Sequence, residues 1–116
     1  MNIIESEFAE IVVKIEKTYI NELRVFLIDN SFLDVWFSLK LEKRYSYHWE
    51  RKQIDSSIFR HDNAPHIKWK HIKTFPKHFH NKTETNVESS YISDKPEKAI
   101  FEMMNFIKNY IKNKNF

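Results

Sequence analysis

The first forty residues change from one hydrophobic period to another. Over residues 4–19, apolar side chains recur at spacings of three and four with charged residues between them, which predicts an amphipathic helix. Residues 23–28 and 32–39 instead follow a period of two, and Asp29 and Asn30 stand between these two runs. The two runs therefore predict a β-hairpin that the helix packs against.

Two more strands are predicted before the chain leaves the sheet. Residues 44–50 alternate aromatic and polar side chains, and residues 56–61 resume an extended pattern after a polar turn. With the hairpin, they form an antiparallel meander of four strands. Pro65 cannot donate to a sheet ladder, so the chain must leave the sheet there, and a fifth strand is predicted near residues 74–80.

The C-terminal part predicts a connection followed by a helix. Residues 81–90 are polar and predict an exposed connection, whereas Asp94, Pro96 and Glu97 are typical of a helix start. Apolar residues then recur at helical spacing. The fold class that we predict is α+β, with an antiparallel sheet of four to five strands flanked by an N-terminal and a C-terminal helix. Since 116 residues suit one domain, we expect residues 1–116 to form a single unit.

Two residue types are missing from the sequence, cysteine and glycine. Without cysteine there are no disulfides and no Cys-ligated zinc, and without glycine there is no glycine-rich nucleotide loop. Turns with positive φ should then use Asn or Asp, as at residues 29–30, 62–63 and 81.

No apolar run reaches the roughly 20 residues of a membrane span. The N-terminal stretch is acidic, unlike a signal peptide, so we expect a cytoplasmic protein without membrane contact.

Residues 60–80 contain most of the candidate chemistry. Five of the six histidines lie there, and five Lys or Arg residues accompany a single acid, Asp62. Such a segment attracts phosphate groups, although lysines alone more often mark a solvated loop. His78 and His80 are two residues apart, so on a strand their imidazoles share one face, roughly 6–7 Å apart along the backbone. This spacing suits two ligands of one metal ion, or an acid and a base beside one phosphate.

Two motifs in this segment, RHDNAPH at residues 60–66 and TFPKHFH at residues 74–80, resemble the TumE-type toxin family of prokaryotic toxin–antitoxin modules. The resemblance runs from about residue 31 to the closing helix. It implies a type II toxin whose partner is a helix-turn-helix antitoxin protein. Many relatives have a second histidine where Ile67 stands, so a mechanism that needs this histidine is not expected here. The matching positions are Asp62, Asn63, Pro65, His66, Phe75, Pro76, His78 and His80.

The side-chain chemistry favours metal-independent RNA cleavage as the first hypothesis. Histidines with pKa values near 6.5 serve as both base and acid, so we assign His66 and either His78 or His80 to proton transfer. Asp62 would orient an imidazole. The residues assigned to substrate binding are Arg60 and Lys77 for phosphate, Trp69 and Phe79 for stacking on unpaired bases, and Asn63.

Two alternatives stay open at this stage. The same residues could hold a divalent metal ion such as zinc or manganese in a hydrolase, with His78 and His80 joined by His66 or Asp62. No other cofactor is expected. The segment could instead bind nucleic acid or a protein without catalysis, with its histidines bonded to loop backbone, which is the commoner role of any single histidine. A homodimer is left open as well.

Overall fold

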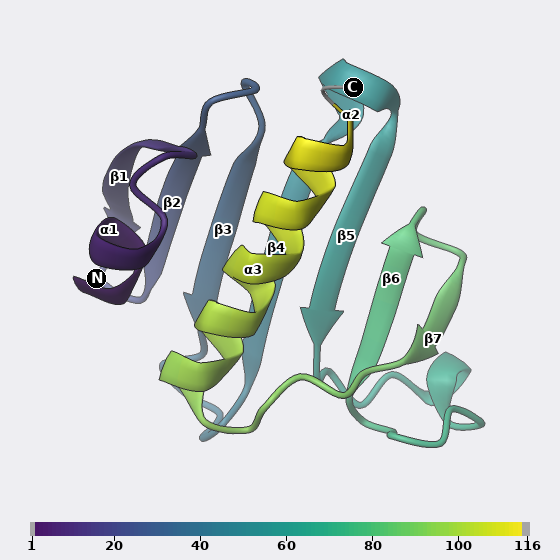
Figure 1. Cartoon of the computed structure of the whole chain (residues 1–116). Coiled ribbons are helices and arrows are strands. Elements are labelled where there is room, and N and C mark those ends of the chain that lie inside the picture. Colours follow the sequence, from purple (N-terminus) through teal and green to yellow (C-terminus); the bar gives the residue numbers. More distant parts are fainter. Residues whose placement is uncertain (1, 115–116) are drawn as a thin grey trace.

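Seven strands follow one another across a single antiparallel sheet in the computed structural model, which describes residues 2–114 (Figure 1). Each strand pairs with the next in the chain, as in the predicted meander. The α+β class is confirmed, but the predicted four to five strands are too few. The strands are β1 Val12–Tyr19, β2 Glu22–Leu27, β3 Phe32–Phe37, β4 Tyr45–Arg51, β5 Ser57–Asp62, β6 His78–Lys82 and β7 Val87–Ser89. The helices are α1 Asn2–Glu7, α2 Lys52–Asp55, the 3-10 turn η1 Ile67–Trp69, and α3 Pro96–Lys114.

The N-terminal helix is much shorter than predicted. It ends at Glu7, and residues 12–19 form the edge strand β1, which pairs with β2. A spacing of four residues places two side chains on one face of a helix and also on one face of a strand, so this part of the pattern fits both conformations. In β1 only Val12 and Ile15 are half-buried, so pairing with β2 decides the conformation of this segment.

The prediction for residues 81–90 is also wrong, because β6 extends to Lys82 and β7 follows at residues 87–89. These strands at the sheet edge gain backbone hydrogen bonds without needing an alternating apolar pattern. The predicted fifth strand begins at His78 rather than near Thr74. The preceding residues form a turn in which the Lys77 N–H donates to the Thr74 carbonyl at 2.9 Å.

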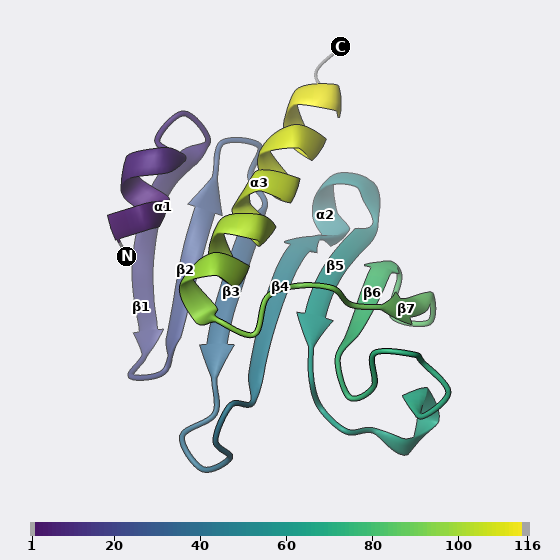
Figure 2. The ribbon, with the colours of Figure 1, turned by 60° about the horizontal axis from the view of Figure 1, so that its bottom comes forward.

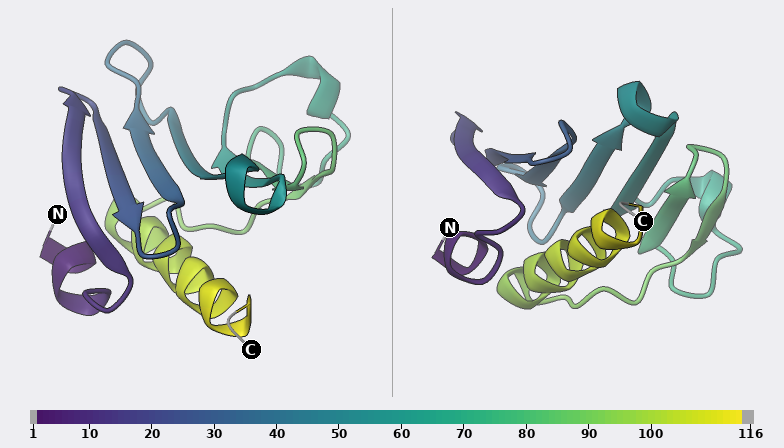
Figure 3. Two further views of the ribbon diagram at one scale, coloured as in Figure 1. Left: turned by 90° about the horizontal axis from the view of Figure 1, so that it is seen from above. Right: turned by 45° about the horizontal axis from the view of Figure 1, so that its top comes forward.

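Both α1 and α3 cover the same face of the sheet, as the rotated views show (Figures 2 and 3). The C-terminal helix α3 buries the apolar positions that its periodicity predicted, namely Ile100, Met103, Met104, Ile107 and Ile111. Trp49 and Phe59 pack edge-on against Tyr110 of this helix, at 5.2 and 5.1 Å between ring centroids. The hydrophobic core therefore lies between the sheet and the two helices.

The opposite side of the sheet, which we call the open face, is covered by neither α1 nor α3 (Figure 3). Strand alternation and register place a row of polar side chains across it. Residues 63–77, including η1, fold onto this side of the sheet beside β6. The row runs through Arg24, Asp34, His48, Arg60 and His80 on five successive strands.

Turns with positive φ use an unexpected set of residues. Asn30 has φ 72°, as predicted, but the other described residues with positive φ are Lys43, Ser56 and Lys82. Asn63 keeps an ordinary φ and uses its side chain instead, because its Oδ1 accepts from the Tyr45 N–H at 3.0 Å and its Nδ2 donates to the Lys43 carbonyl at 2.8 Å. The side chain of Asn63 thus ties the end of β5 to the start of β4.

Candidate functional site

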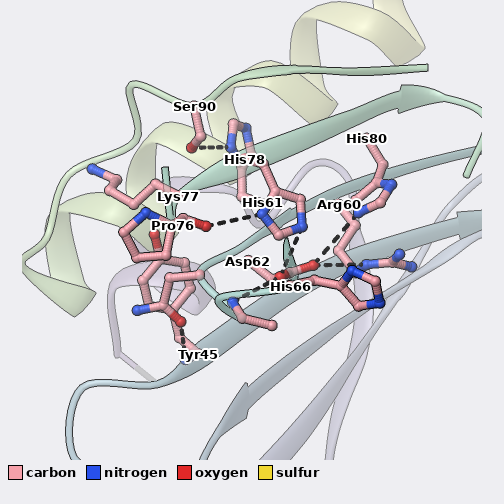
Figure 4. Close-up of polar contacts among 12 residues, drawn as sticks. Tyr45, Arg60, His61, Asp62, His66, Pro76, Lys77, His78, His80 and Ser90 are labelled. Atoms are coloured by element: carbon pink, nitrogen blue, oxygen red, sulfur yellow. Dashed lines mark hydrogen bonds and ion pairs between the residues drawn. The ribbon is translucent and has the colours of Figure 1, made fainter. Parts of the chain in front are cut away.

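Three side chains form what we call the Asp–His–His cluster on the open face, where β5 lies beside β6 (Figure 4). Asp62 is the direct cross-strand partner of His78, and its Oδ1 lies 3.0 Å from His78 Nε2. Asp62 Oδ2 lies 3.7 Å from His80 Nε2. All three residues are buried, with relative exposures of 9%, 2% and 4% for Asp62, His78 and His80. The predicted shared face of the two histidines is confirmed, and Asp62 joins them from the neighbouring strand.

Backbone carbonyl groups orient both imidazoles of the cluster. His78 Nδ1 lies 2.9 Å from the Pro76 carbonyl oxygen, and His80 Nδ1 lies 2.9 Å from the Glu84 carbonyl oxygen. Because a carbonyl oxygen only accepts, each Nδ1 carries the proton and donates it. Both Nε2 atoms consequently point toward Asp62.

Arg60 links the cluster to the rest of the open face. Its Nε donates to Asp62 Oδ2 at 3.1 Å, and its Nη1 donates to His48 Nδ1 at 3.2 Å. Its two terminal nitrogens also hold the Glu84 carboxylate, at 2.5 and 3.3 Å. Since Arg60 can only donate, His48 accepts at Nδ1 and donates from Nε2 to Glu50 Oε1 at 3.1 Å. Arg60 therefore stands at the centre of a continuous polar network.

The environment shifts the pKa values of the cluster in different directions. Burial alone would raise the pKa of the Asp62 carboxyl, but the hydrogen bond with His78 lowers it overall. Burial opposes protonation of His78, yet the Asp62 carboxylate and the Pro76 carbonyl raise its pKa overall. Burial and the nearby Arg60 charge lower the pKa of His80. The environment thus favours the charged form of Asp62 and of His78, and the neutral form of His80.

Segment 63–77 places Trp69 over the cluster and also carries the exposed His66. The Trp69 ring lies 6.2 Å from the His78 ring and 5.9 Å from the His80 ring, so it covers both imidazoles of the cluster. His66 is exposed, and its Nδ1 accepts from the Lys68 N–H at 3.2 Å. Within residues 2–114, no hydrogen bond or ion pair joins His66 to Asp62, His78 or His80.

Two residues assigned to substrate binding have contacts away from the cluster. Phe79 lies on the helix-covered face, where it stacks on His61 at 4.2 Å and on Phe59 at 6.3 Å between centroids. Lys77 Nζ donates to the Ile92 carbonyl and pairs with Asp94 Oδ1 at 3.1 Å. The structure therefore places Arg60 and Trp69 next to the cluster, and Phe79 and Lys77 outside it.

His61 belongs to the covered face as well. Its Nδ1 lies 2.7 Å from Ser90 Oγ, and burial together with the Lys77 charge lowers the pKa of His61 to about 4. His61 and Phe79 line an apolar cavity of about 370 Å³ between the β6–β7 edge and α3. This cavity lies on the other side of the sheet from the cluster.

Sequence reasoning missed two members of the network, His48 and Glu84. Alternation along residues 44–50 shows that His48 faces away from the aromatic side chains, but only the β4–β5 register reveals Arg60 as its neighbour. Glu84 lies in a stretch interpreted as an exposed connection, and no local pattern connects it to Arg60, 24 residues earlier. Contacts of this kind are fixed by strand pairing rather than by spacing.

Together, the fold and the site define a small α+β protein with a buried Asp–His–His cluster and an arginine on an open sheet face. The family model described as Toxin TumE matches residues 2–111, and the chain belongs to this toxin family. The protein is thus the toxin component of a toxin–antitoxin module, and its family implies an antitoxin as partner. No curated protein and no solved structure gives a significant match. Across residues 2–114, no helix has the length and apolar character needed to cross a membrane.

Proposed function

We propose that this toxin cleaves RNA at the open face, with Arg60 and the Asp–His–His cluster at the centre of the site. The observation that carries the proposal is the buried network of Arg60, Asp62, His78 and His80 on the face that α1 and α3 leave free. Burying ionisable groups costs free energy, so a network of this density is a candidate for chemistry rather than for stability alone.

Arg60 is the proposed phosphate-binding residue. A guanidinium binds a phosphate through two parallel N–H donors, as it binds a carboxylate. Arg60 already holds the Glu84 carboxylate with both terminal nitrogens, at 2.5 and 3.3 Å. The Glu84 side chain is 51% exposed, and a phosphate of the RNA backbone would take the place of its carboxylate.

Segment 63–77 would guide the RNA and then move aside. Its side chains at Lys68, Lys70 and Lys73 are exposed and would attract the RNA backbone. Trp69 covers the two imidazoles, so RNA would reach the cluster once this segment is displaced. In that state the indole would be free to stack on an unpaired base. His66 of this segment follows Asp62 by four residues and would supply an exposed proton-transfer group.

The proposed partner is a helix-turn-helix antitoxin protein of a type II module. Membership in the toxin family supports an antitoxin, and the exposed basic segment at residues 68–73 suits an acidic protein surface. An antitoxin bound there would hold Trp69 over the cluster and would keep RNA away from Arg60.

The test is induction of the toxin in a bacterial host, with growth and total RNA followed together. The double variant His78→Ala/His80→Ala should abolish both growth arrest and RNA loss. The matched control is His71→Ala, which removes an exposed histidine of the same segment and should leave both effects intact. Growth arrest with intact RNA would discard the ribonuclease and keep the toxin.

One observation favours a second candidate function, RNA binding without cleavage. His78 and His80 are almost fully buried, as expected of histidines that only hold a sheet edge and its loop together. Purified protein would then shift RNA on a gel and leave it whole. Cleavage products that disappear in the double variant would exclude this candidate.

A further inference from the structure

We infer that the Asp–His–His cluster is a binding site for one divalent transition-metal ion of the zinc class. Asp62 Oδ and an Nε2 or Nδ1 of each histidine lie within 4.8 Å of one another, which is the one such group of three among residues 2–114. Bonds of roughly 2.0–2.2 Å to zinc place two ligands no more than about 4 Å apart. A bound ion would therefore draw the three side chains slightly inward, without any change in strand register.

The hydrogen bonds around the two imidazoles are those of metal ligands. In metal sites, a ligating histidine usually donates its other ring N–H to a backbone carbonyl or a carboxylate, which fixes the tautomer. Both histidines do so here, His78 to the Pro76 carbonyl and His80 to the Glu84 carbonyl. This leaves both Nε2 atoms directed at the same carboxylate. The sheet thus presents two oriented imidazole nitrogens beside one carboxylate oxygen, and a bound cation would displace any proton on His78 Nε2.

The contact between His80 and Asp62 is incomplete without a cation. His80 Nε2 lies 3.7 Å from Asp62 Oδ2, which is longer than an N–H···O hydrogen bond. The Nδ1 proton of His80 is already used at the Glu84 carbonyl. Nε2 of the buried His80 and a carboxylate oxygen therefore face each other beyond hydrogen-bond distance, and a cation between the two atoms would bind both.

The carboxylate is supported as a metal-ligating group would be. The Ala64 N–H donates to Asp62 Oδ1 at 3.1 Å, and Arg60 Nε donates to Asp62 Oδ2 at 3.1 Å. These donors fix the direction of the carboxylate while leaving lone pairs free for coordination.

The donor set indicates which metal ions would bind. Two imidazole nitrogens and one carboxylate oxygen suit Zn²⁺ and neighbouring first-row ions, whereas Mg²⁺ and Ca²⁺ prefer oxygen ligands alone. Three protein ligands leave one position of a tetrahedral ion open. Arg60 donates to the same Asp62 carboxylate, so a phosphate held by the guanidinium would be close to the ion. This chemical use rests on the proposed function, whereas the existence of the site does not.

The test is metal binding to the purified full-length protein after treatment with a chelator. Calorimetric titration with Zn²⁺, and with Co²⁺ as a coloured probe, should show one equivalent bound. The variants Asp62→Asn, His78→Ala and His80→Ala should each weaken binding by about tenfold or more. His71→Ala is the matched control and should bind as the wild type does. Absence of stoichiometric binding by the wild type, or an equal loss in His71→Ala, would overturn the inference.

A second measurement needs no variant and so does not depend on how the variants fold. X-ray absorption of the Zn²⁺-loaded wild type should show two imidazole ligands, and signals from fewer than two would overturn the inference. RNA cleavage assays on chelated and reloaded protein separate this inference from the proposed function. If the protein cleaves RNA but binds no metal ion, the metal site is wrong and the proposed ribonuclease activity stands. If it binds one equivalent of metal but does not cleave RNA, the metal site stands and the ribonuclease activity is wrong.

Discussion

His78 Nε2 lies 3.0 Å from Asp62 Oδ1, across a directly paired position of β5 and β6. Because both side chains are buried, Asp62→Asn should destabilise the protein by roughly 1–3 kcal/mol and should abolish toxicity. Denaturant unfolding and growth after induction measure the two effects. Asp34→Asn is the matched control, because Asp34 also pairs with an arginine, Arg24, on the open face. A fully toxic Asp62→Asn variant at normal abundance would contradict the central role of this contact.

Glu84 should compete with RNA for Arg60. Its exposed carboxylate pairs with both terminal nitrogens of the guanidinium. Exposed ion pairs are worth about 0–1 kcal/mol, so Glu84→Gln should tighten RNA binding by roughly two- to fivefold. Gel-shift titration at fixed salt measures the change. Glu88→Gln removes an equal charge from the neighbouring strand β7 and controls for general electrostatics. Equal gains in the two variants would show that Glu84 has no specific role.

A buried arginine makes the stability of the fold sensitive to acid. Arg51 is 3% exposed and pairs with the carboxylates of Asp29 and Asp55. Burial alone would raise the pKa values of both carboxyl groups, but bonds to Ser31, Ser57 and Arg51 lower them overall. A lowered folded-state pKa stabilises the protein above the unfolded-state value near 3.8, and this stabilisation is lost as pH falls below that value.

The free energy of unfolding should accordingly be lower at pH 3 than at pH 7. Asp29→Asn should cost roughly 1.5–3 kcal/mol at pH 7, because Arg51 then loses a charged partner. The variant should also lose less stability on acidification than the wild type. Urea unfolding at both pH values provides the comparison, with Asp34→Asn as a carboxylate control on the open face. Identical pH dependence in wild type and Asp29→Asn would contradict the linkage to Asp29.

Ser56 ends α2 in the left-handed region, with φ 63° and ψ 20°. This conformation costs a residue with a Cβ atom roughly 1–2 kcal/mol. Glycine avoids this cost, but it loses more conformational entropy on folding, which offsets part of the gain. Ser56→Gly should therefore raise the free energy of unfolding by about 0.5 kcal/mol. Ser56→Ala keeps the Cβ atom and should give no gain. Thermal unfolding of the two variants and the wild type measures these differences. Equal stability of Ser56→Gly and the wild type would show that the turn is not strained.

Several parts of the fold are encoded locally. The period-two stretches that became β2, β3, β4 and β5 each carry their own alternation and turn residues, so they were predictable without knowledge of the tertiary structure. The same is true of α3, whose apolar residues lie on one side of a helix. Residues 12–19 and 87–89 lack a strong local pattern, and their strand conformation depends on pairing with a neighbour.

By itself, the sequence determined that His78 and His80 share one face of a strand, since alternation is a property of the backbone. It also concentrated five of the six histidines in residues 60–80. Only the tertiary structure decided which groups meet. The β5–β6 register sets Asp62 opposite His78, and the β6–β7 turn brings Glu84 to Arg60. A shift of one residue in register would turn Asp62 away from both histidines, so the cluster exists because of strand pairing.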